Sequence, residues 1–169
     1  MAITRLGGAN AITGTLPAAN INDTSIGNIT ALPAGVGGKV LQVVTATDST
    51  RRTTTSLTWV TSSNTLSVTI TPSSASNKIF IELNTSIFGV GLRTYTTIFR
   101  DSTNLGDASY GMSQSTTGTW TGLGMSYLDS PSSTSALTYQ FYWQNGGSGT
   151  AYMNGDNGTA SITAFEIAG

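Results

Sequence analysis

The sequence predicts an all-β protein, an antiparallel two-sheet sandwich of the jelly-roll type preceded by an extended N-terminal arm. Three observations over the 169 residues lead to this fold class. Apolar residues alternate with polar residues in short runs, as in half-buried strands. Clusters of Ser, Thr, Asn, Gly and Pro separate the runs and supply turns. No stretch shows the 3.6-residue apolar period of an amphipathic helix.

Residues 1–38 form the predicted arm and its glycine hinge. Single aliphatic side chains stand among Gly, Ala, Asn and Thr at irregular spacings that match neither a helix nor a strand. They are Ile3, Leu6, Ile12, Leu16, Ile21, Ile26, Ile29 and Leu32. Pro17 and Pro33 also oppose regular structure. We expect an arm that docks these side chains one at a time onto another surface, the alternative being a flexible leader.

Residues 39–169 form the predicted β-sandwich domain. The expected strands, in chain order, are 39–46, 55–61, 66–70, 79–87, 95–100, 120–128, 136–143, 151–154 and 160–168. The first is apolar on both faces, which predicts a mostly buried strand. Gly122 and Gly124 share one face of the strand 120–128, where glycine indicates a bulge or a close neighbour. That face is also a candidate contact with a second subunit.

The composition excludes several classes of function. Charged residues make up 9% of the chain, and His and Cys are absent, which removes thiolate chemistry, histidine acid–base catalysis and zinc sites built on these ligands. A net charge of −1 gives no electrostatic footprint for nucleic acid. No apolar stretch approaches the roughly 18 residues of a spanning helix, and the N-terminus lacks a secretory signal. We therefore expect neither nucleic-acid binding nor membrane insertion.

Paired carboxylates are the one catalytic device that this composition leaves. Most of the acidic residues adjoin Ser, Gly or Asn in expected turns, where Asp caps its own backbone. Glu82 and Glu166 lie within strands, on faces that we expect to meet solvent or a subunit. No pair is singled out for glycosidase chemistry. The sequence therefore predicts a protein that is not an enzyme and uses no cofactor or metal.

The stretch 101–119 interrupts the alternation and is the best candidate for an outer recognition loop. It carries Asn104, Asp107 and Tyr110, and Tyr110 is the aromatic residue that we most expect to be exposed. Abundant hydroxyl groups and low charge suit the recognition of a sugar, although they suit a merely soluble surface equally well.

Six segments carry a resemblance that spans nearly the whole chain: MAITRLGGANAITGTLP at 1–17, GVGGKVLQVV at 35–44, VTITPSSASNKI at 68–79, YLDSPSSTSALTY at 127–139, GTAYMN at 149–154 and SITAFEIAG at 161–169. In this order they resemble a family of small virion structural proteins of tailed bacteriophages, common in marine and cyanobacterial phages. The resemblance implies a trimer-forming jelly roll, distantly similar to C1q/TNF-like domains, displayed on the particle exterior as a fibre, tip or decoration.

These observations together predict a virion surface structural protein, made in the host cytoplasm. We expect a homotrimeric head decoration, of the cement or fibre kind, whose arm docks on a phage capsid or tail protein. The chain lacks a coiled-coil or repetitive shaft, which opposes a long tail fibre. The alternative is a tail fibre or tail tip protein that recognises a host surface glycan through the loop carrying Asn104, Asp107 and Tyr110.

Overall fold

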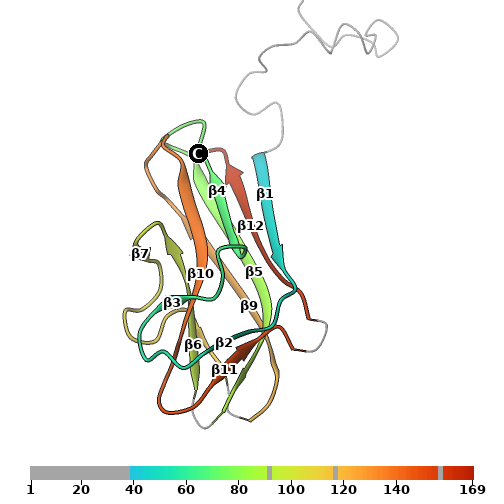
Figure 1. Ribbon diagram of the computed structural model, residues 1–169. Coiled ribbons are helices and arrows are strands. Elements are labelled where there is room, and N and C mark those ends of the chain that lie inside the picture. Colours follow the sequence, from blue (N-terminus) through green and yellow to red (C-terminus); the bar gives the residue numbers. More distant parts are fainter. Residues whose placement is uncertain (1–38, 91–92, 116–117, 156–157) are drawn as a thin grey trace, which may run out of the picture. The chain divides into compact units, whose positions relative to one another are not determined.

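The computed structural model describes residues 39–169 apart from 91–92, 116–117 and 156–157. The predicted docking arm and its eight aliphatic residues lie outside the described residues. Two antiparallel sheets pack face to face (Figure 1), which confirms the predicted all-β sandwich. In the described part of the chain, no helix is long and apolar enough to cross a membrane.

The first sheet contains six strands: β1 (Val40–Asp48), β2 (Arg52–Thr54), β5 (Lys78–Gly89), β9 (Thr121–Asp129), β11 (Ala151–Met153) and β12 (Ala160–Ile167). β1 pairs with β12, β12 with β5, and β5 with β9. β2 and β11 pair with each other, and β11 also pairs with β5 beyond the end of β12. The sheet is therefore four strand positions wide, and we call each position a ribbon. In order across the sheet, the first ribbon contains β1 and β2, the second β12 and β11, the third β5 and the fourth β9.

The second sheet also contains six strands: β3 (Val60–Thr61), β4 (Ser67–Ile70), β6 (Thr94–Arg100), β7 (Thr103–Asn104), β8 (Ser113–Gln114) and β10 (Leu137–Asn145). β3 and β4 pair with β10, β10 pairs with β6, and β6 pairs with β7 and β8. Six of the eleven connections between the described strands cross from one sheet to the other. This exchange between two four-ribbon sheets is the jelly-roll arrangement that the sequence predicts.

The core lies between the sheets and follows the alternation read from the sequence. In β10 the side chains of Leu137, Tyr139, Phe141 and Trp143 all point inward and are buried. β5 contributes every second residue from position 79 to position 83 in the same way. Fully burying one such side chain contributes about 1.5–3 kcal/mol, so these strands can hold the sheets together without disulfides.

Two predicted strands differ from the observed ones. The strand at 39–46 is not mostly buried: β1 lies at the sheet edge, and Val40, Leu41 and Val43 are about half exposed. The segment 55–61 is mostly loop, and only β3 remains of it. The hydroxyls of Thr54 and Ser56 bond nearby backbone N–H groups there, so the backbone adopts local turns in place of a ladder.

The glycines of β9 mark neither a bulge nor a close neighbour within the chain. The β5–β9 register is continuous through Gly122 and Gly124. A side chain at position 122 would meet no atom within 4 Å, and one at position 124 would make only an ordinary contact with Asn84. Both glycines therefore lie on an open part of the outer face of the first sheet.

Candidate functional site

The predicted recognition loop is shaped by two of its own polar side chains. Asn104 Oδ1 accepts hydrogen bonds from the Thr97 hydroxyl at 2.6 Å and the Gly106 N–H at 2.9 Å, while Asn104 Nδ2 donates to the Asp107 carbonyl at 3.0 Å. Asp107 Oδ1 accepts from the backbone N–H groups of Ser109 and Tyr110, both at 2.8 Å. The polar groups of Asn104 and Asp107 therefore stabilise the loop, and the loop exposes the side chain of Tyr110.

The same backbone hydrogen bonds favour the ionised form of the Asp107 carboxyl group. The backbone N–H of Tyr110, followed by that of Ser109, stabilises the carboxylate and lowers the pKa of Asp107 below its usual range. The carboxylate is thus ionised throughout the neutral range, and the turn that carries Tyr110 keeps its shape there.

The loop is also fastened to the second sheet from outside. Trp59 Nε1 donates to the Ala108 carbonyl at 2.7 Å, and Gln144 Nε2 donates to the Ser109 carbonyl at 2.7 Å. Gly111 adopts φ +69°, and a Cβ there would lie 2.4 Å from the Thr96 carbonyl oxygen. Only glycine fits this close approach, so Tyr110 is carried by a loop that is held on both sides.

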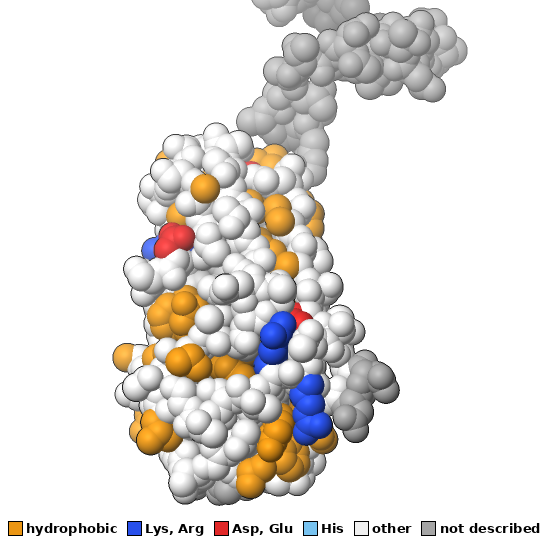
Figure 2. All heavy atoms as spheres, viewed as in Figure 1, with side chains coloured by type: hydrophobic (Ala, Val, Ile, Leu, Met, Phe, Trp, Pro, Cys, Tyr) orange, Lys and Arg blue, Asp and Glu red, His pale blue; other side chains and the backbone are white. Residues whose placement is uncertain are grey.

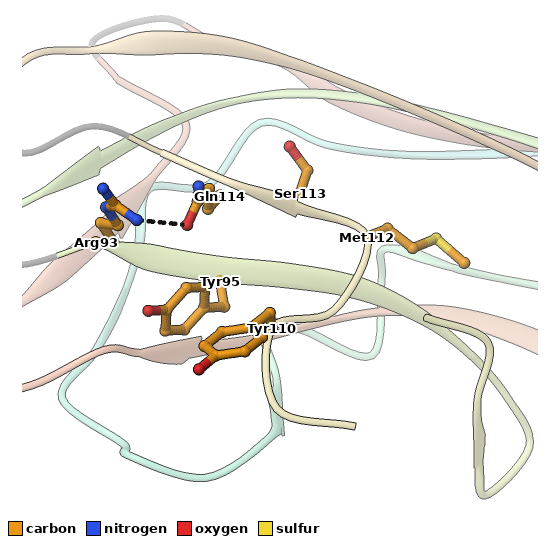
Figure 3. A pocket seen from close by; sticks show the side chains of 6 residues that line it. All are labelled: Arg93, Tyr95, Tyr110, Met112, Ser113 and Gln114. Carbon is orange, nitrogen blue, oxygen red and sulfur yellow. Dashed lines mark hydrogen bonds between the residues drawn. The ribbon is translucent and has the colours of Figure 1, made fainter. Parts of the chain in front are cut away.

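A hollow of about 570 Å³ opens beside this loop. It is lined by Arg93, Tyr95, Tyr110, Met112, Ser113 and Gln114 (Figure 3). The rings of Tyr95 and Tyr110 meet edge to face with centroids 5.4 Å apart. Arg93 Nη1 donates to Gln114 Oε1 at 3.3 Å, so aromatic and hydrogen-bonding groups converge on one surface hollow.

Sequence reasoning identified Tyr110 but missed the other residues of the hollow. Tyr110 is 64% exposed, as its position in an interrupted stretch suggested. Tyr95 was expected only as the first residue of the strand 95–100, and Arg93 was not singled out. Gln114 reaches Tyr95 only because the two-residue strand β8 pairs with β6 in that register, and nothing in the sequence signals such a short pairing.

A second surface feature is a row of apolar side chains on the outer face of the first sheet. Val43, Phe165, Phe80 and Leu128 occupy matching register positions on β1, β12, β5 and β9, and we call them the apolar row. Val43 and Leu128, at its two ends, are 53% and 50% exposed. The row therefore crosses the whole width of the sheet.

The apolar row borders a polar and open area. A hollow of about 340 Å³ lies next to Phe80 and is lined also by Glu82, Asn84, Gly124, Met125 and Ser126. Among the described strands β9 pairs only with β5, so its other edge is unpaired. The face drawn in Figure 2 carries few charged side chains. This combination of an apolar row, a hollow and an unpaired edge is typical of a surface that meets another chain.

The carboxylates serve the fold. All six that the structure describes accept hydrogen bonds from the chain itself: Asp48, Glu82, Asp101, Asp107, Asp129 and Glu166. Within the described residues no group of three or more acidic side chains could hold a metal ion.

We expected Glu166 to meet solvent or a subunit, and that expectation is wrong. Its side chain faces the interior and is 1% exposed. Its Oε1 accepts from Asn77 Nδ2 at 2.5 Å and from the Ser73 N–H at 2.6 Å, and its Oε2 accepts from Gln42 Nε2 at 2.6 Å. Burial alone would raise the pKa of Glu166, but these hydrogen bonds outweigh it and lower the pKa to about 2. The residue is a buried structural anion.

The fold and these surfaces define a jelly-roll sandwich with a tyrosine-lined hollow at one loop and, on one sheet, an apolar row whose end residues are half exposed among the described residues. Comparison with known proteins found no family model and no curated protein that matches the chain.

Proposed function

We propose that the protein is a non-enzymatic structural protein of the virion surface of a tailed bacteriophage. In this proposal it is made in the host cytoplasm and forms a homotrimeric head decoration on the particle exterior, docked on a capsid or tail protein by residues 1–38. The resemblance of the six segments supports the virion assignment. The single structural observation that supports assembly is the apolar row across the outer face of the first sheet.

Burial of the apolar row by copies of the same chain accounts for several features at once. Contiguous apolar side chains on a soluble surface mark an interaction site more often than scattered ones do. The open glycine face of β9 lets a neighbouring backbone approach closely. A low net charge adds little repulsion between copies. Closed rotational symmetry is the usual outcome for identical subunits, and the resemblance implies three of them.

A charge placed in the apolar row is expected to dissociate the assembly. We expect the full chain to sediment as a trimer at micromolar concentration and the Leu128→Asp variant to sediment as a monomer. Assembly would bury the new carboxylate in the subunit interface without a cation to pair with it. Leu57→Asp is the matched control: Leu57 is 63% exposed in the β2–β3 connection, away from the row. Sedimentation equilibrium measures the mass, and circular dichroism checks that each variant is folded. A monomeric wild type, or dissociation by both variants, contradicts the proposed interface.

Removal of the arm is expected to abolish attachment and to leave assembly intact. A chain lacking residues 1–33 should remain a folded trimer and fail to bind particles, because its aliphatic docking residues are gone. Particle attachment is measured by co-sedimentation with purified virions. Copy number on native particles then separates the locations: hundreds of copies indicate the head, and a few to tens indicate the tail. If the truncated chain still decorates particles, the docking role of the arm is wrong.

A second candidate function is recognition of a host surface glycan, as a tail fibre or tail tip protein would perform it. The observation that favours it is Tyr110, which is largely exposed although its loop is held by Asn104, Asp107, Trp59 and Gln144. Binding of the full chain to host cells or to a glycan panel tests this function. Complete absence of binding to both would remove it.

A further inference from the structure

We infer that the hollow between β6, β8 and the loop 105–112 binds an acidic saccharide. In this assignment the Tyr110 ring stacks on the sugar, and Arg93 and Gln114 bind the sugar carboxylate. The inference rests on the second candidate function, glycan recognition, and adds to it a site and a class of ligand.

The Tyr110 ring forms an aromatic platform in the hollow. Tyr110 is 64% exposed, and Tyr95 supports it edge to face at 5.4 Å. Its backbone N–H is bonded to Asp107, and the neighbouring carbonyls of Ala108 and Ser109 are bonded to Trp59 and Gln144. A ring held in this way loses little conformational entropy when a ligand stacks on it. The electron-rich face of an aromatic ring favours the C–H groups of a sugar.

Arg93 and Gln114 supply hydrogen-bonding groups to the hollow. A guanidinium has five N–H donors, and Arg93 uses one of them on Gln114 Oε1. That bond uses one of the two lone pairs of Gln114 Oε1 and orients the side chain, whose amide nitrogen can donate to a ligand. Arg93 and Gln114 lie together at one end of the hollow, beside the two tyrosine rings (Figure 3). This end of the hollow therefore offers mainly donors, which suit a ligand rich in acceptor oxygens.

Arg93 gives the hollow a positive charge. Arg52 and Arg100 are each paired with a carboxylate, Asp48 and Asp129 respectively. Among the described residues Arg93 has no ion-pair partner, and no acidic side chain lines the hollow. A sugar carboxylate would thus meet a planar guanidinium that can bind it through two N–H groups, without repulsion from the lining. A neutral sugar would leave that charge uncompensated.

The test measures binding of the full chain to two pairs of probes by isothermal titration calorimetry. Each pair consists of an acidic sugar and its neutral counterpart. The first pair is a galacturonic acid hexasaccharide and a galactose hexasaccharide, and the second is sialyllactose and lactose. We expect at least one acidic probe to bind about tenfold more tightly than its counterpart, since hydrogen bonds to a charged group are stronger than neutral ones.

Three variants assign this preference to the hollow. Tyr110→Ala should lose binding to both members of the pair. Arg93→Gln should lose the acidic preference and keep weak neutral binding. Arg51→Gln removes the same charge outside the hollow, where Arg51 lies 4.8 Å from the ring centroid of Tyr152, and should bind like the wild type.

The outcomes separate this inference from the function on which it rests. Equal affinity for acidic and neutral probes, an acidic preference that survives Arg93→Gln, or no acidic binding at millimolar concentration overturns the inference. Glycan recognition itself fails only if the full chain also binds no member of a broad glycan panel and no host cell.

Discussion

Replacement of Asp129 by alanine is expected to lower the free energy of unfolding by about 3 kcal/mol, at the lower end of the range for breaking a buried ion pair. Asp129 ends β9 and is buried. Arg100 Nη1 donates to both of its carboxylate oxygens at 2.9 and 2.8 Å, and the Tyr139 hydroxyl donates to Oδ2 at 2.7 Å.

The size of this effect follows from where the three residues lie. Asp129 belongs to the first sheet, whereas Arg100 in β6 and Tyr139 in β10 belong to the second, so the cluster joins the two sheets. Burial and the bond to Asp129 both raise the pKa of Tyr139, which keeps its hydroxyl protonated as a donor. The variant would leave a cation and a buried hydroxyl without their acceptor. The side chain of Arg100 is 25% exposed, and water reaching it limits the cost.

Urea denaturation of the full chain measures this difference, with all variants at one protein concentration so that assembly contributes equally. Tyr139→Phe is the graded control, because it removes one hydroxyl and keeps the ion pair. It should cost about 1 kcal/mol. A loss for Asp129→Ala no larger than that for Tyr139→Phe would show that the ion pair does not stabilise the sandwich.

Acid is expected to destabilise the domain through Glu166. The pKa of this residue is about 2 in the folded chain, against an ordinary value of 4.5. Its stabilising contribution is therefore complete above pH 4.5 and is lost as the pH falls from there to about 2. The difference corresponds to about 3 kcal/mol at neutral pH.

The Glu166→Gln variant separates this carboxylate from the other acidic groups. Glutamine resembles the protonated acid, so the variant should be less stable at pH 7 and should approach the wild type near pH 2. Some acid sensitivity should remain in it. Burial raises the pKa of Asp48, but hydrogen bonds from Thr50, Arg52, Thr65 and Ser63 outweigh this and lower it to about 2.

Urea midpoints between pH 7 and pH 2 give the comparison. The expected result is a difference between wild type and Glu166→Gln that shrinks steadily as the solution becomes more acidic. A difference that stays constant over this range would mean that the variant disturbs packing and that the charge of Glu166 contributes nothing.

The strands were predictable where one face of a run is apolar and the other polar. The alternation in 79–87 and 136–143 reappears as the inward faces of β5 and β10. It was less informative in β1, where apolar residues occupy both faces. A sequence run of this kind does not tell a central strand from an edge strand, because the difference depends on which other strands pair beside it.

Glu166 shows the same limit for a polar residue. Its alternation with Ile162 and Ala164 places it on the core face of β12, yet a buried carboxylate needs donors to be tolerated. Those donors come from Gln42, Ser73 and Asn77, which are far away in the sequence. The sequence does not show that these donors lie next to Glu166, so it favoured an exposed position, and that expectation was wrong.

The sequence by itself determined the fold class, the inward face of most strands, and the exposure of Tyr110. These depend on local alternation, turn residues and propensities, which act between neighbours along the chain. Only the tertiary structure decided that β1 lies at an edge, that the apolar row crosses four ribbons, and that Arg93, Tyr95 and Gln114 join Tyr110 around one hollow. Each of these requires segments distant in sequence to meet in a particular register, and strand register is set by the packing of the whole sandwich.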